Sequence, residues 1–253
     1  MGFNIFSRSL YPRPLGGGEW EFVSRFLKSG MTVFDIGANQ GLCTILAAAR
    51  VGSEGKVIAF EPAPTECRKL RANLRLNRCQ NVIVEPMALG SREGVTDFHL
   101  CLDHQGSFSS IRRQAPDVTA RTELIKVPIT TLDCYIQRAP TPSLHLMKID
   151  AEGAELDILK GAAWTLANLR PVMINELAEV RTRQWGYPAS EIYSWLAARG
   201  YRWFEPTSEG GLRAAPKKEC YEPEENLVAV PDELVKQIVP RSCNQGTAPM
   251  DRA

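Results

Sequence analysis

The chain has 253 residues, 44% of them hydrophobic, and its 30 basic and 29 acidic residues leave a formal net charge of +1. This length predicts one large domain with a substantial core, and the small net charge excludes the strong field that draws a protein to nucleic acid or to an anionic membrane. Seven cysteines without a C-x-x-C pair, no signal-peptide pattern and no apolar run long enough to span a bilayer predict a cytoplasmic protein with reduced thiols.

Residues 1–30 are expected to form a loop and a helical lead-in to the fold. Trp20, Val23, Phe26 and Leu27 fall on one helical stripe in this segment, which stops at Gly30. At the other end of the chain, residues 240–253 are polar and are expected to form a disordered tail.

Between residues 31 and 239, short apolar runs alternate with helical patterns. We expect strands at residues 31–37, 56–62, 81–90, 144–150, 171–176, 201–206 and 226–231. Helices are expected at residues 41–52, 65–77, 153–169 and 190–200. This alternation, with near-continuous apolar strands, predicts an α/β fold with a doubly wound, mostly parallel sheet. Residues 94–132 interrupt the rhythm and are expected to form an insert with strands near 95–102 and 124–129.

Three of the expected strands end in carboxylates, namely Asp35, Glu61 and Asp150. Ligands of open α/β sheets bind at the carboxyl ends of the strands, so these side chains are expected to converge on one crevice. Glu61 could accept hydrogen bonds from both ribose hydroxyls of a nucleoside, or it could cap the helix that begins near Pro64.

A glycine-rich turn, Gly37-Ala38-Asn39-Gln40-Gly41, follows the first expected strand. Glycine at such a point means that the backbone turns sharply or lets something approach closely. Asn39 stands where a dinucleotide-binding turn has its second glycine, and no P-loop pattern is present. The turn therefore suits a ligand with an adenosine and a small carboxylate better than one with phosphates.

The motifs FDIGANQG, VIAFEP, NVIVEPMALGSREG, TTLD, KIDAEGAELDILKGA and PVMINE, in this order, resemble those of the FkbM family of S-adenosylmethionine-dependent methyltransferases. The resemblance covers roughly residues 31–232. It implies the Rossmann-like class I methyltransferase fold, with a seven-stranded sheet whose last strand is antiparallel. It also implies S-adenosyl-L-methionine as cofactor and transfer of its methyl group to an oxygen nucleophile, on a hydroxyl of a sugar, a glycan or a secondary metabolite.

Carried over onto this chain, the resemblance implies a set of cofactor-binding residues. It puts the methionine half of the cofactor near Asp35, Gly37, Asn39 and Gly41, and the ribose near Glu61 and Pro62. Many class I enzymes have an acidic or amide residue after the third strand, but this chain has Met87 and Ala88 there, so adenine is expected to lie against Met87 and to be recognised by backbone groups. Ser109, in the insert, is a further candidate for contact with cofactor or substrate.

Asp150 is expected beside the transferred methyl group and is our first candidate for general base, followed by Glu152 and then His104. If the strand continued past Asp150, Glu152 would share its face, and close carboxylates raise one another's pKa. Alternatively, Glu152 and Glu155 supply negative charge to the first turn of the following helix. Asp150, Glu152 and Glu176 could offer oxygen ligands to Mg²⁺, but no spacing demands it, and no metal is predicted.

The acceptor itself is not identified by these residues. Trp185 and Tyr187 could stack on a sugar or simply pack on a neighbouring helix, and Arg112 and Arg113 could receive an anionic acceptor or remain solvated. Three alternatives to O-methyl transfer stay open: N- or C-methyl transfer on the same fold, a catalytically silent methyltransferase-like binding domain, and a nicotinamide oxidoreductase, which the glycine pattern disfavours. The oligomeric state is not predicted.

Overall fold

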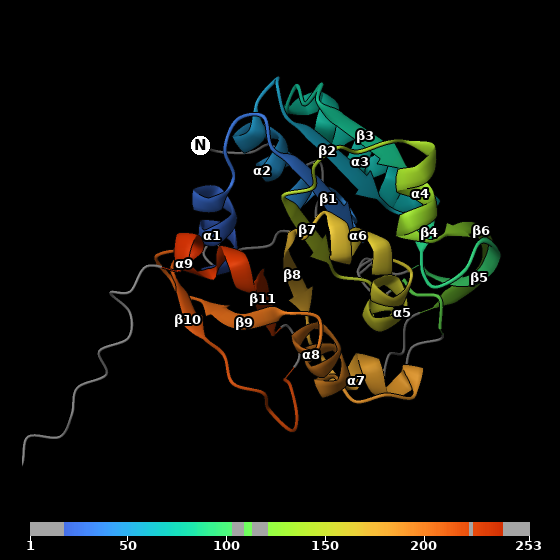
Figure 1. Cartoon of the computed structure of the whole chain (residues 1–253). Helices are drawn as coiled ribbons and strands as arrows, with labels where there is room; N and C mark the ends of the chain where they lie inside the picture. The colour runs from blue at the N-terminus through green and yellow to red at the C-terminus, as the bar shows by residue number, and fades with distance from the viewer. Residues whose placement is uncertain (1–17, 103–108, 113–120, 223–224, 240–253) are drawn as a thin grey trace, which may run out of the picture.

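A computed structural model describes residues 18–102, 109–112, 121–222 and 225–239, and its central feature is an eight-stranded sheet between two layers of helices (Figure 1). Across the sheet, the strands follow the order β10 (Leu212–Ala214), β9 (Tyr201–Pro206), β11 (Asn226–Pro231), β8 (Val172–Glu176), β7 (Leu146–Ile149), β1 (Thr32–Ile36), β2 (Lys56–Phe60) and β3 (Val82–Glu85).

The sheet is doubly wound, as the sequence predicts. The chain runs from β1 through β2 to β3 on one side, and then returns to the other side of β1 to form β7 and β8. Each of these neighbouring pairs is parallel. The winding direction therefore reverses between β1 and β7, which is where a ligand crevice is expected in such a sheet.

The predicted number of strands is wrong by one. The last strand, β11, is antiparallel to both of its neighbours, β8 and β9, as predicted. The additional strand, β10, pairs with β9 at the edge of the sheet. Of its three residues Leu212 is buried and the other two are exposed, so it lacks the apolar run by which the other strands are recognised.

Both faces of the sheet are covered, which explains why its strands are apolar on both sides. One face packs on α1 (Gly18–Phe26), α2 (Leu42–Val51), α3 (Pro64–Leu76) and α9 (Val235–Ile238). The other face packs on α4 (Leu132–Arg138), α5 (Glu155–Lys160), α6 (Ala163–Asn168) and α8 (Ser190–Ala197). Side chains alternate accordingly, since Val33 faces the first layer and Phe34 the second.

The insert and the preceding β4 (Ala88–Leu89) form a small second sheet in the order β4, β6 (Thr122–Thr130) and β5 (Gly94–Cys101), at one side of the molecule beside α4 (Figure 1). β5 and β6 are antiparallel and correspond to the two strands that the sequence predicts there. Phe98 and Val127 on the inner face of this sheet pack with Ala63, which follows β2. The insert thus lies beside the carboxyl ends of the main strands.

The helix predicted over residues 153–169 is in fact two helices, α5 and α6. The break falls at Gly161, whose close approach to Gly90 leaves no room for a side chain: a Cβ there would lie 2.0 Å from the Gly90 carbonyl oxygen. The Asp133 carboxylate accepts hydrogen bonds from the backbone amides of Trp164 and Thr165, at 2.8 and 2.9 Å, and so caps α6. Asp133 lies on α4, a helix that the sequence analysis did not predict.

Candidate functional site

A cavity lies at the carboxyl ends of β1, β2 and β7, where the winding reverses. It encloses about 800 Å³ of empty space, part of it open to solvent. Residues from the main sheet, from the loops after its strands and from the insert all contribute to the wall. The predicted site residues that line it are Gly37, Asn39, Glu61, Pro62, Met87, Ala88, Ser109, Asp150 and Glu152.

The glycine-rich turn packs first of all against the protein itself. Gly37 has φ +78°, and a Cβ at this position would lie 1.8 Å from the carbonyl oxygen of Asp150. Its amide donates to the carbonyl of Phe60 at 3.0 Å. Gly41 has φ +91° and lies just before α2, where a Cβ would lie 2.3 Å from Leu70 Cδ1 of α3. Gly37 therefore joins three strand ends, whereas Gly41 is buried against α3 and does not line the cavity.

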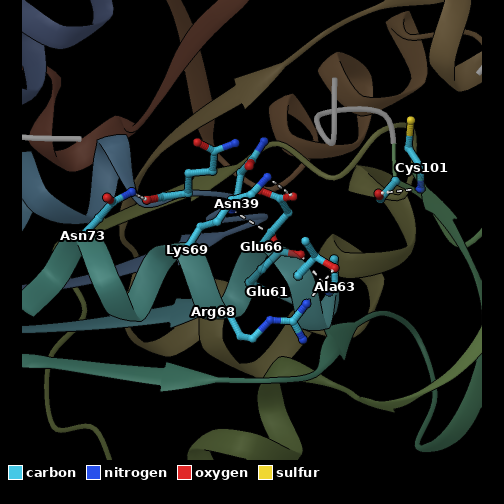
Figure 2. A network of polar contacts seen from close by, with 11 residues as sticks. Asn39, Glu61, Ala63, Glu66, Arg68, Lys69, Asn73 and Cys101 are labelled. Carbon is cyan, nitrogen blue, oxygen red and sulfur yellow. Dashed lines mark hydrogen bonds and ion pairs between the residues drawn. The ribbon is translucent and has the colours of Figure 1, made fainter. Parts of the chain in front are cut away.

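The Glu61 side chain links the loop after β1 to its own loop, which follows β2 (Figure 2). Its Oε2 accepts a hydrogen bond from the Asn39 amide at 2.7 Å, and its Oε1 accepts one from the Ala63 amide at 2.8 Å. The residue is only 6% exposed. Burial raises its pKa to about 7, although both backbone hydrogen bonds act in the opposite direction. Because Ala63 immediately precedes α3, Glu61 both faces the cavity and supports the start of that helix.

Asp35 lies behind the cavity and not in its wall. It is fully buried, and Thr44 Oγ1 of α2 donates a hydrogen bond to its Oδ2 at 2.5 Å. Its other oxygen, Oδ1, has no hydrogen-bond partner among the described residues. Burial raises the pKa of this carboxyl. Neither Asp35 nor Gly41 lines the cavity, so their contact with the cofactor stays a prediction.

Asp150 lines the cavity and forms an ion pair with a residue that sequence reasoning missed. Lys148 Nζ lies 2.8 Å from Asp150 Oδ2, and Lys148 is buried on β7. Burial acts to raise the pKa of Asp150, but the charge and hydrogen bond of Lys148, together with Glu176 and Arg181, hold that pKa below its ordinary value. The signal in the sequence was a single lysine within the apolar run LHLMKID.

Glu152 does not share a strand face with Asp150, because the strand does not continue past Asp150. β7 ends at Ile149, and Glu152 has φ +55° in the turn that follows. Its carboxylate pairs with Arg181 at 2.9 Å. Its carbonyl accepts hydrogen bonds from Ser110 Oγ at 3.2 Å and from Trp185 Nε1 at 3.3 Å. The turn is thereby fixed from the insert and from the segment after β8.

Glu155, the first residue of α5, stabilises the same turn from inside. Its Oε1 accepts hydrogen bonds from the amides of Ala151 and Gly153, at 2.9 and 3.2 Å. Burial raises its pKa to about 7. This arrangement agrees with a structural role for Glu155 rather than a catalytic one, since it does not line the cavity.

Both aromatic candidates pack on this turn. Tyr187 Oη donates to the Gly153 carbonyl at 2.6 Å, and the Trp185 ring leaves no room for a Cβ at Gly153. The Arg112 guanidinium lies 4.8 Å from the centroid of the Trp185 ring, a cation–π contact. The sequence makes Trp185 and Tyr187 candidates either for stacking on a sugar or for packing within the protein. Their contacts with Gly153 are packing contacts with the turn before α5.

The remaining candidates are placed as follows. Ser109 Oγ accepts a hydrogen bond from the Cys101 amide at 3.0 Å and reaches the cavity wall. His104 and Arg113 lie outside the described residues, as do residues 1–17 and the predicted tail. Within the described ranges, no three His, Cys, Asp or Glu side chains come together in a way that could hold a metal ion. In the same ranges, no helix has the length and hydrophobicity needed to cross a membrane.

Comparison with known proteins gives matches of several kinds. The family model of the methyltransferase FkbM domain matches residues 35–203. Methyltransferase 1 of Beauveria bassiana is 25% identical over 178 residues, which are 60% of this chain and 71% of that protein. A methyltransferase FkbM from Methylobacillus flagellatus KT aligns with a TM-score of 0.49 and 14% identity, over 79% of this chain and 44% of that one. This chain thus spans less than half the length of that structure. An O-methyltransferase from Bacillus cereus, in complex with SAH, aligns with a TM-score of 0.48 and 14% identity, over 83% and 79% of the two chains.

Proposed function

Because the chain belongs to the FkbM methyltransferase family, we propose that it transfers a methyl group from S-adenosylmethionine to a hydroxyl oxygen of a small-molecule or glycan acceptor. The observation that carries this proposal is the buried Glu61 carboxylate, fixed by two backbone amides in the wall of a cavity at the switch point of the sheet. Such a carboxylate can bind the vicinal hydroxyls of a ribose.

The residues of the cavity fit the cofactor. Each Glu61 oxygen accepts one hydrogen bond from the protein, and a carboxylate oxygen has a second lone pair that remains for a ribose hydroxyl. Phe60, Met87 and Leu89 give the wall an apolar part suited to adenine. Asp150 and Glu152 give it an acidic part suited to the positive sulfonium and amino groups of the cofactor. The negative charges of a triphosphate would be repelled by these carboxylates.

The sulfonium of the cofactor supplies an activated leaving group, so the protein has mainly to position the acceptor and to remove its proton. Positioning can contribute roughly 7–11 kcal/mol in favourable systems, against roughly 3–5 kcal/mol, or 10²–10⁴-fold, from a general base. The low pKa of Asp150 makes it a weak base, and the Glu152 carboxylate is held in an ion pair with Arg181. We therefore assign the larger share of the rate acceleration to positioning, with Asp150 as the proton acceptor that faces the cavity.

Calorimetric titration tests the cofactor assignment. We expect S-adenosylhomocysteine to bind and NAD not to bind; the reverse result would exclude the proposed function. Glu61→Ala should weaken the affinity for S-adenosylhomocysteine by about 1–3 kcal/mol, or roughly 5- to 150-fold, because a charged hydrogen-bond acceptor is lost. Glu123→Ala, an exposed glutamate on β6, is the control and should bind as the wild type does. Equal affinities in the two variants would remove Glu61 from the ribose site.

The atom that receives the methyl group is tested separately. Candidate acceptors are incubated with a donor whose methyl carbon is labelled with carbon-13, and the chemical shift of the product distinguishes methyl on oxygen, nitrogen and carbon. A methyl group on nitrogen or carbon would favour the alternative transferases. Binding of S-adenosylhomocysteine without turnover of any acceptor would favour a catalytically silent domain.

A further inference from the structure

Three ionisable side chains meet at the ends of two neighbouring strands. β7 and β8 are parallel, with Lys148 opposite Ile174 and Ile149 opposite Asn175. Asp150 and Glu176 are the next residues on each strand, so their side chains leave neighbouring strand ends on the same side of the sheet. After burial and the Lys148 ammonium, a hydrogen bond with Glu176 is among the causes that set the pKa of Asp150, and it lowers that pKa. Two carboxyl groups can share a hydrogen bond only if one of them carries a proton.

The charges around Glu176 show which carboxyl carries it. Asp150, Glu152 and Glu155 all face Glu176 with negative charge, and Lys148 faces it with positive charge. Lys148, however, forms its ion pair with Asp150, and Arg181 forms its ion pair with Glu152. Both of these ion pairs are thus made with carboxylates other than Glu176, which is mostly buried and lies among the negative charges of Asp150, Glu152 and Glu155. Burial and neighbouring negative charge both favour the neutral form of such a group.

We propose that Asp150 and Glu176 share one proton, that Glu176 holds it, and that Glu176 is a positioning residue whose hydrogen bond keeps Asp150 ionised and oriented for the acceptor. The assignment rests on the methyl transfer proposed above. Lys148 completes the arrangement, because its ammonium holds Oδ2 of Asp150 from the buried side. Burial, followed by the charges of Asp150, Glu152 and Glu155, raises the pKa of Glu176 well above its ordinary value, whereas that of Asp150 lies below its own.

In the reaction, the hydroxyl proton of the acceptor passes to the ionised carboxylate of Asp150 as the oxygen–methyl bond forms and the methyl–sulfur bond breaks. Glu176 keeps its own proton throughout. Asp150 then releases the transferred proton to solvent through the cavity, which restores the state with one shared proton.

The test is a carbon-13 NMR titration of the side-chain carboxyl groups in the ligand-free protein, assigned through the backbone. At about pH 8, ordinary glutamates are ionised, and Glu61 and Glu155, with pKa values of about 7, are mostly ionised as well. We expect the Glu176 carboxyl to be still protonated there. If it titrates in the range of an exposed glutamate, the proposal is overturned, and this measurement needs no variant.

Two variants then test the positioning role. Glu176→Gln keeps a hydrogen-bond donor without charge, so the pKa of Asp150 should stay low, whereas Glu176→Ala removes the donor and should raise it. If Glu176 were ionised instead, both variants would lower the pKa of Asp150, because a neighbouring negative charge would be lost; that result, or no shift in the Ala variant, would overturn the proposal. Glu123→Gln on β6 serves as the control. Calorimetry with S-adenosylhomocysteine reports on the proposed function independently of this titration.

Discussion

We expect Gly37→Ala to lower the free energy of unfolding much more than an ordinary glycine-to-alanine substitution does. Gly37 has φ +78°, a conformation that costs an alanine roughly 1–2 kcal/mol. The new Cβ would also lie 1.8 Å from the carbonyl oxygen of Asp150, which is backbone and cannot rotate away. Overlap of this kind in a packed region adds roughly 1–3 kcal/mol. The sum, roughly 2–5 kcal/mol, is a large fraction of the stability of an ordinary domain.

Gly30→Ala is a matched control for this prediction. Gly30 has φ +84°, and no atom lies within 4 Å of the point that a Cβ would occupy, so it carries the conformational cost without the overlap. Urea unfolding of both variants gives the two free energies of unfolding, and their difference isolates the contact with Asp150. We expect Gly37→Ala to be less stable than Gly30→Ala by about 1–3 kcal/mol. Agreement of the two within about 0.5 kcal/mol would refute the reasoning that Gly37 is required by a close approach.

Three further predictions concern single side chains. Asp150→Asn should bind S-adenosylhomocysteine with near wild-type affinity in calorimetry yet lower kcat by orders of magnitude in an acceptor assay; an unchanged kcat would remove Asp150 from the role of proton acceptor. Glu155 has a folded-state pKa of about 7, above its unfolded value, so its neutral form stabilises the protein fully below about pH 4.5 and this contribution is lost as the pH rises through 7. In Glu155→Gln the free energy of unfolding, measured in urea across this window, should therefore fall less steeply with pH, by up to about 1.4 kcal/mol per pH unit; a slope equal to the wild type's would contradict the assignment. Thr44→Val should cost about 1–3 kcal/mol of stability in the same assay, because Asp35 would lose its hydrogen-bond donor in a fully buried place, and a cost near zero would show that Asp35 is satisfied in another way.

The sequence predicts the main architecture well because the strands that form it are short, apolar and buried on both faces. It fails for β10, which has one buried side chain, and for the break between α5 and α6. That break depends on Gly161 meeting Gly90, which lies far away in the chain, and on a cap from Asp133. Contacts of this kind have no local pattern.

The candidate site shows the same division. Glu61 and Asp150 stand at strand ends, a position that local patterns identify, and the structure places both in the cavity wall. The cations that pair with Asp150 and Glu152 are harder to identify: Lys148 is a single lysine within the apolar run of β7, and Arg181 comes from the segment after β8. The position of Glu152 could not be predicted from the sequence, because its pairing with Arg181 and its left-handed backbone depend on tertiary contacts. The alternation of side chains in the sequence does not show that β7 ends at Ile149.

The position of β11 has a consequence for how the protein is made. β11 is the last strand in the described part of the chain, yet it lies between β8 and β9 and joins the β9–β10 pair to the rest of the sheet. During synthesis, β8 and β9 each keep an unpaired hydrogen-bonding edge until residues 226–231 leave the ribosome. Exposed edges of this kind recruit other chains. A premature stop just before Asn226 should therefore yield insoluble aggregates rather than a slightly shortened enzyme.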